Sequence, residues 1–258
     1  MVRVISYPQR VTGTWRFDLV VERLIGRCDQ VIVPSLVLQD IATRIWRLPA
    51  NKVRYLPNGI DCDRFARQPD RELVTALQIP NDALVIGTVA ALRKEKNLIR
   101  LVRVFASLPR DIEARLVIIG DGPERPALEQ VIANLNVSAR VVLVGALGQP
   151  ERLLGRFDIF ALSSDTEQMP YSVLEAMAAG LPVVSTNVGD VKRMLTPENA
   201  DFIVPIVDEN RLAHQLLRLL QNSVLRVRIG KANQQKVHSE YSMEHMVDCY
   251  ATLFSAAI

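Results

Sequence analysis

The feature that most constrains the fold of this chain is a repeated alternation of short, β-branched apolar runs with longer amphipathic segments. The runs predict strands at residues 30–34, 52–56, 84–89, 115–119, 141–144, 159–162, 182–185 and 202–204. Apolar residues at three-and-four spacing predict helices at 98–107, 126–135, 172–179, 211–222 and 243–254. Strands separated by helices in this way are typical of a parallel sheet covered by helices. The sequence therefore predicts an α/β fold built on a Rossmann-like parallel sheet with helices on both faces.

Composition narrows the classes of function that need to be considered. The 258 residues include 31 Lys and Arg interleaved with 28 Asp and Glu, which gives a net charge of +3 without any basic block. This pattern does not predict nucleic-acid binding, whereas an anionic small ligand or loose contact with an anionic membrane surface is compatible with it. No apolar run approaches the ~20 residues of a membrane span, and three widely separated cysteines do not predict a disulfide framework. We expect a cytoplasmic protein that can approach the inner face of the membrane.

The most informative segment reads SSDTEQMPYSVLEAMAAGLPVV and contains two acidic residues, Glu167 and Glu175. Glu167 follows a predicted strand, and Glu175 lies inside the next predicted helix. Ligands of open α/β sheets bind at the carboxyl ends of strands, where a helix start favours a pyrophosphate. Ionised carboxylates only accept hydrogen bonds, so each Glu suits a pair of sugar hydroxyls. By spacing alone, a solvated loop carboxylate and a solvated helix residue are the alternative.

A second segment, IGTVAALRKEKNLIRLVRVFASL, places Arg93 and Lys96 between a predicted strand and a predicted helix. Cations in such a loop, with a helix N-terminus behind them, form a reasonable diphosphate site. The alternative for both side chains is a solvated loop position. Arg10 and Arg16, in the segment SYPQRVTGTWR, are further candidates for contact with a phosphate or an acceptor.

These segments together resemble the group 1 glycosyltransferases, a glycogen-synthase-like retaining family of the GT-B type. Four motifs carry the resemblance in order: LPNGIDCDRF at 56–65, the loop with Lys96, IIGDGPERPALEQ at 118–130, and a Glu-x7-Glu pattern at Glu167 and Glu175. The resemblance implies that Glu167 binds the hydroxyls of the donor sugar, that Glu175 binds the ribose, and that Lys96 neutralises the leaving diphosphate. Ala91 stands where the family has an Arg, so Arg93 is expected to substitute for it.

The remaining candidates for donor binding come from the loop and helix start after Glu167 and from two turns. The loop after the strand VVLV is where the resemblance places contact with the nucleobase, and the GDGP turn is expected beside the nucleotide. These candidates are Gln168, Met169, Pro170, Tyr171, Ser172, Val173, Leu174, Gly145, Ala146 and Gly120. No metal ligand and no cofactor are predicted.

The resemblance also implies a division of the chain into three parts. Residues 1–65 are expected to be a remnant of an acceptor-side Rossmann-like domain, 66–238 the nucleotide-sugar-binding domain, and 239–258 a helix that packs back toward the first part. The implied activity is transfer of a hexose, with retained anomeric configuration, from a UDP- or GDP-linked sugar to a saccharide or lipid-linked acceptor. We expect weak or no activity from this chain alone.

Three other functions are compatible with parts of this pattern. A non-catalytic nucleotide-sugar-binding subunit would complete its cleft with a partner chain that carries the first domain. A nicotinamide-dependent oxidoreductase would share the α/β pattern, but Arg125 replaces the third glycine of its fingerprint. A sugar-nucleotide epimerase would act without an acceptor.

Overall fold

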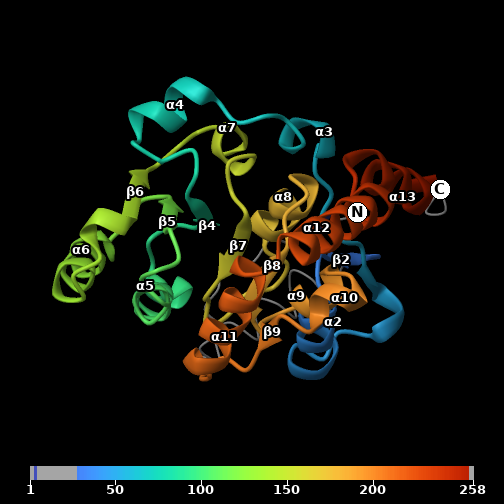
Figure 1. Ribbon diagram of the computed structural model, residues 1–258. Coiled ribbons are helices and arrows are strands. Elements are labelled where there is room, and N and C mark those ends of the chain that lie inside the picture. Colours follow the sequence, from blue (N-terminus) through green and yellow to red (C-terminus); the bar gives the residue numbers. More distant parts are fainter. Residues whose placement is uncertain (1–2, 5–27, 256–258) are drawn as a thin grey trace.

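The computed structural model describes residues 3–4 and 28–255, and in this part of the chain the strands form two parallel sheets (Figure 1). The smaller sheet has the order β1-β2-β3 and contains β1 (Arg3–Val4), β2 (Val31–Val33) and β3 (Val53–Tyr55). The larger sheet contains β4 (Leu84–Val89), β5 (Ala114–Ile119), β6 (Val141–Gly145), β7 (Ile159–Leu162), β8 (Val183–Thr186) and β9 (Ile203–Val204). Every predicted strand overlaps one of these strands, and the predicted α/β fold is confirmed.

The order of the larger sheet determines where a ligand can bind. Its strands lie in the order β6-β5-β4-β7-β8-β9, and all the pairings are parallel. The chain therefore moves outward in one direction from β4 and then returns to lie on its other side at β7. In doubly wound sheets this reversal opens a crevice at the carboxyl ends of the two strands, where ligands bind. The expected site lies beyond Val89 and Leu162.

Helices cover both faces of the larger sheet. One face packs against α5 (Leu98–Ala106), α6 (Arg125–Asn134) and α11 (Glu209–Leu220), and the other against α7 (Glu151–Leu154) and α8 (Tyr171–Ala178). Successive residues of β4 point to opposite cores, as Val85 and Ile86 do, and both are fully buried. Burying an aliphatic side chain of this size contributes about 1.5–3 kcal/mol, so both cores stabilise the sheet.

Several helices were not predicted. The longest is α12 (Ser223–Glu240), which packs against α8 and contributes Val237 to the core on the α8 side and Ile229 to the core on the other face. The shorter α-helices that were not predicted are α7, α2 (Leu36–Asp40), which continues as a π-helical turn (Ile41–Ile45), α3 (Cys62–Phe65), α4 (Arg71–Ala76), α9 (Val191–Met194) and α10 (Pro197–Ala200). The predicted last helix is confirmed as α13 (Met243–Ser255).

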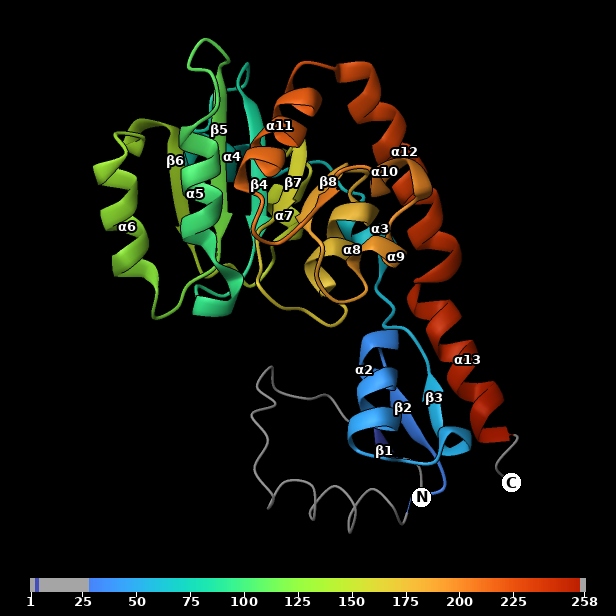
Figure 2. The same cartoon turned by 90° about the horizontal axis from the view of Figure 1, so that it is seen from below.

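The smaller sheet lies at one end of the molecule with α2 packed against it (Figure 2). The segment that leads from β3 to α3 is one connection and joins the smaller sheet to the larger part, and a second connection, from α12 to α13, passes beside it. These connections meet, because the Ile60 N–H donates to the Tyr241 carbonyl at 3.0 Å and the Met243 N–H donates to the Ile60 carbonyl at 2.8 Å. The exact limits of the three predicted parts stay a prediction. Among the described residues, no helix combines the length and the apolarity that crossing a membrane requires.

Candidate functional site

A cavity of about 670 Å³ lies at the carboxyl ends of β4, β5 and β7, where the strand order reverses. The ends of these strands contribute apolar walls through Val89, Ile119 and Leu162. Pro34 and Asn58 line the cavity from the side of the smaller sheet. The cavity therefore faces both parts of the chain.

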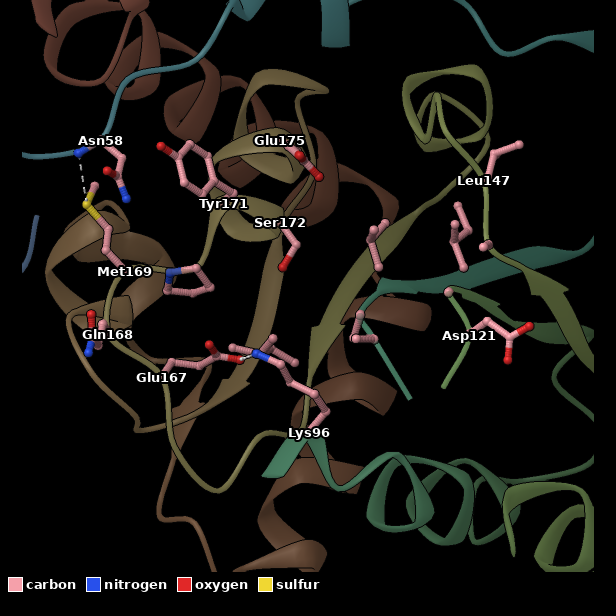
Figure 3. A pocket seen from close by; sticks show the side chains of 18 of the residues that line it. Asn58, Lys96, Asp121, Leu147, Glu167, Gln168, Met169, Tyr171, Ser172 and Glu175 are labelled. Atoms are coloured by element: carbon pink, nitrogen blue, oxygen red, sulfur yellow. Dashed lines mark hydrogen bonds and ion pairs between the residues drawn. The ribbon is translucent and has the colours of Figure 1, made fainter. Parts of the chain in front are cut away.

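Glu167 and Lys96 form an ion pair at one side of this cavity (Figure 3). The Lys96 ammonium donates to Glu167 Oε1 at 2.6 Å, and the Ser164 hydroxyl donates to the same oxygen at 2.7 Å. Glu167 is only 7% exposed, so the pairing offsets the cost of burying its charge. An ammonium has three donor hydrogens, so Lys96 can hold Glu167 and donate to an anionic ligand as well.

The loop that carries Lys96 is held against the loop after β7 by hydrogen bonds to its backbone carbonyls. The Ser163 hydroxyl donates to the carbonyls of Lys96 (3.1 Å) and Asn97 (3.0 Å), and the Asp165 N–H donates to the Glu95 carbonyl at 2.8 Å. These bonds explain why Lys96 and Glu167, 71 residues apart, meet in one place.

The α8 helix supplies the opposite side of the cavity. Its N-cap residue, Pro170, makes no side-chain capping bond, and Tyr171, Ser172 and Glu175 line the cavity (Figure 3). The free N–H groups and positive dipole end of a helix start attract an anion. The arrangement therefore places a diphosphate-binding helix end across from the Lys96 ammonium.

Glu175 lies in the middle of α8, one turn after its start, and is partly buried. Burial, and after it the charge of Glu151, raises the pKa of Glu175 to about 7, although the charge of Arg64 acts in the opposite direction. Glu151 is itself only 8% exposed and pairs with the Arg64 guanidinium at 2.7 Å. Its second oxygen, Oε2, makes no hydrogen bond to any described residue. The carboxylates of Glu151 and Glu175 thus both lie in the field of one cation, the Arg64 guanidinium, which is paired with Glu151.

Backbone contacts set the position of the loop after Glu167. The Asp190 N–H donates to the Gln168 carbonyl at 2.8 Å, and the Asn58 N–H donates to the Met169 sulfur at 3.3 Å. Gly189 has a φ of +51°, and a Cβ there would lie 2.3 Å from the Gln168 carbonyl oxygen. The close approach of the two loops therefore requires glycine at position 189.

Most of the predicted site residues line the cavity. These are Glu167, Lys96, Glu175, Gln168, Met169, Pro170, Tyr171, Ser172, Ala146 and Gly120. The side chains of Val173 and Leu174 are fully buried in the core behind α8, so only their backbone could face a ligand. Gly145 is not among the lining residues, and its carbonyl accepts the Gly120 N–H at 2.8 Å.

Arg93 does not lie where the sequence analysis expected it. Its side chain is exposed and lines a separate cavity of about 330 Å³ with Lys94 and Arg103, while Ala91 lines the main cavity. The geometry does not support substitution of Arg93 for the missing family Arg. Arg10 and Arg16 lie outside the described residues.

Sequence reasoning did not select several residues of the site. Asn58 and Asp121 line the cavity, and both belong to turns that the motifs already contained, LPNGID and GDGP. Arg64 belongs to the LPNGIDCDRF motif, but Glu151 and Asp190 carried no motif signal. Among residues 3–4 and 28–255, no group of three His, Cys, Asp or Glu side chains is arranged to hold a metal ion.

Solved structures of similar fold include a glycosyltransferase from Rickettsia africae, with a TM-score of 0.85 over 99% of this chain and 70% of that one, at 16% identity. Anabaena HepE, in a crystal structure in complex with UDP, superposes with a TM-score of 0.86 over 95% of this chain and 69% of that one, at 21% identity. At this identity the likeness concerns the fold.

Curated relatives are also glycosyltransferases or synthases. N-acetyl-alpha-D-glucosaminyl L-malate synthase of Bacillus anthracis is 26% identical over 80% of this chain and 54% of its own length. The lipopolysaccharide core biosynthesis glycosyltransferase LpsE of Rhizobium meliloti is 28% identical over 98% of this chain and 69% of its own length. The chain thus spans between about half and two thirds of these two relatives.

The family assignment rests on the larger sheet and its helices. Residues 70–236 match the family described as glycosyl transferases group 1, and this range includes Lys96, Glu167 and Glu175. The resemblance inferred from the four motifs is confirmed, and the chain belongs to the group 1 glycosyl transferases.

Proposed function

We propose that this chain carries the donor-binding part of a retaining hexosyltransferase that uses a nucleoside diphosphate sugar. The observation that carries the proposal is the convergence of the Lys96–Glu167 pair, Glu175 and the start of α8 on one cavity at the strand-order reversal. A cation and a helix end suit a diphosphate, and the two carboxylates on either side suit hydroxyl groups.

In this scheme the sugar is transferred when the bond between its anomeric carbon and the diphosphate breaks. The diphosphate leaves with the bonding electron pair, and the acceptor hydroxyl bonds to the anomeric carbon and gives its proton to an oxygen of the departing diphosphate. Lys96 and the α8 N-terminus stabilise the negative charge that develops on the leaving group. Glu167 accepts hydrogen bonds from the sugar hydroxyls, and Glu175 accepts them from the ribose.

The relatives support this class of donor and acceptor. HepE was crystallised with UDP and with UDP-glucose, whereas a relative from Mycobacterium tuberculosis is named a GDP-mannose-dependent alpha-mannosyltransferase. We therefore propose UDP or GDP as the nucleotide. LpsE is named for lipopolysaccharide core biosynthesis, which supports a saccharide or lipid-linked acceptor. Contact with a membrane surface and a partner chain that supplies a fuller first domain stay predictions.

Calorimetric titration with UDP, GDP, ADP and NAD tests the proposal. We expect one of UDP or GDP to bind, with binding much weaker in Glu175→Ala and unchanged in Glu72→Ala, a control at an exposed position of α4. Binding of NAD with no binding of nucleoside diphosphates would instead support the oxidoreductase alternative. Retention is tested separately by the anomeric configuration of the product in an NMR assay.

A further inference from the structure

Asp190 is a buried carboxylate that lies outside the cavity lining and connects the two parts of the chain. It directly precedes α9 and is 3% exposed. Its Oδ2 accepts the Leu36 N–H at 2.5 Å and its Oδ1 accepts the Val37 N–H at 3.3 Å. Leu36 and Val37 form the first turn of α2, which packs against the smaller sheet. An acidic residue of the larger part therefore caps a helix of the smaller part.

The backbone of Asp190 makes a second connection, toward the cavity. Its N–H donates to the Gln168 carbonyl at 2.8 Å, next to Glu167. A Cβ on the neighbouring Gly189 would lie 2.6 Å from the Glu167 carbonyl oxygen and 2.3 Å from that of Gln168, so the two loops are in direct backbone contact. One residue thus touches both α2 and the loop that carries the Glu167–Lys96 pair.

The surroundings of Asp190 indicate that its carboxylate faces the smaller part. Burial, and after it the charge of Asp190, raises the pKa of Tyr55, the last residue of β3. Pro34, two residues before Leu36, lines the main cavity. In this arrangement Asp190 contacts α2 while Pro34, just before α2, lines the cavity.

We infer that Asp190 is a positioning residue that links the placement of the smaller part over the cavity to the geometry of the Glu167 loop. This inference rests on the proposed function of the cavity. When the two parts separate, the first N–H groups of α2 lose their partner and the Asp190 carboxylate is no longer held. When the parts close, the Asp190 carboxylate binds the start of α2, and the backbone N–H of Asp190 holds the loop that carries Glu167. The reactive geometry would then exist only in the closed arrangement.

Amide hydrogen exchange on the full chain tests the contact itself. In Asp190→Ala we expect the Leu36 and Val37 amides to exchange at least about tenfold faster, because each loses a charge-assisted hydrogen bond. The Leu38 amide is the internal control, since it donates to the Ser35 hydroxyl at 3.0 Å and should keep its rate. Asp40→Ala is the matched variant, because Asp40 is an exposed residue at the other end of α2 that pairs with Arg44. Unchanged exchange at Leu36 and Val37 would overturn the inference.

Kinetics distinguish positioning from a merely structural role. We expect Asp190→Ala to lower kcat about tenfold while the nucleotide Kd changes by less than about twofold, because the carboxylate does not line the cavity. Asp190→Asn keeps an acceptor oxygen without the charge, so it should fold and show an intermediate kcat. If both variants lose nucleotide binding and kcat in parallel, the claim that Asp190 is a positioning residue is refuted.

The outcomes for the wild-type chain separate the inference from the proposed function. If wild type binds a nucleoside diphosphate, but Asp190→Ala keeps the wild-type exchange rates at Leu36 and Val37 or the wild-type kcat, the inference alone is refuted. If wild type binds none of the nucleotides, the proposed function is refuted, and the inference with it.

Discussion

Replacing Glu175 with Gln is expected to stabilise the protein at pH 8 and to leave its stability nearly unchanged at pH 4. Burial of the carboxyl, together with the charge of Glu151, raises its pKa from 4.5 to about 7. The folded protein therefore holds the Glu175 proton more tightly than the unfolded chain does. The resulting stabilisation is fully present below pH 4.5 and is lost as the pH rises through about 7.

The size of the effect follows from the two pKa values. Each tenfold difference in proton affinity corresponds to about 1.4 kcal/mol, so the interval from 4.5 to about 7 gives about 3 kcal/mol at most. Gln resembles the protonated carboxyl and does not titrate. The Gln variant should thus gain up to about 3 kcal/mol over wild type at pH 8, and almost nothing at pH 4.

Urea denaturation at pH 4, 6 and 8 measures this difference directly. The same substitution at Glu72, an exposed residue of α4, is the matched control and should show a difference below about 0.5 kcal/mol at every pH. If Glu175→Gln gains nothing at pH 8, or gains equally at all three values, the carboxylate is ionised without cost and the reasoning from its burial is wrong.

The remaining predictions concern the cation loop and the loop contact. Lys96→Ala should lower kcat about tenfold to a hundredfold in a transferase assay, and should destabilise the fold by about 3 kcal/mol in denaturant, because it removes the ammonium that neutralises the buried Glu167 carboxylate; a wild-type kcat would exclude Lys96 from the reaction. Arg93→Ala should change the nucleotide Kd by less than about twofold in calorimetry, because Arg93 lines a separate cavity; a larger loss would restore it to the donor site. Gly189→Ala should destabilise the protein by about 1–3 kcal/mol in urea, since the new Cβ meets backbone atoms at a positive φ; equal stability would show that the loop adapts.

The strands of the larger sheet could be predicted because each is buried on both faces. Such strands read as continuous apolar runs, and the limits predicted for β4 and β7 match the structure residue for residue. The helix α12 could not be predicted in this way. Its buried apolar side chains, Ile229 and Val237, are eight residues apart and lie among charged and polar residues, so the helical period was not visible.

The site was predictable where the chemistry follows one local motif. Glu167 and Glu175 share a segment of nine residues, and Lys96 stands in a loop whose neighbours identify it. The contacts that set the positions and the pKa values of these side chains depend on tertiary packing. Asp190 and Leu36 are 154 residues apart, and the charge of Glu151 acts on Glu175 only because α7 packs beside α8. No local pattern carries such information.

A crystal structure of the chain with UDP or GDP, whichever binds in calorimetry, tests the central claim most directly. The account predicts that the diphosphate lies at the N-terminus of α8, within hydrogen-bonding distance of Ser172 and of the Lys96 ammonium. It predicts that the ribose hydroxyls donate to the Glu175 carboxylate. A nucleotide bound elsewhere, such as in the cavity beside Arg93 and Lys94, would contradict it.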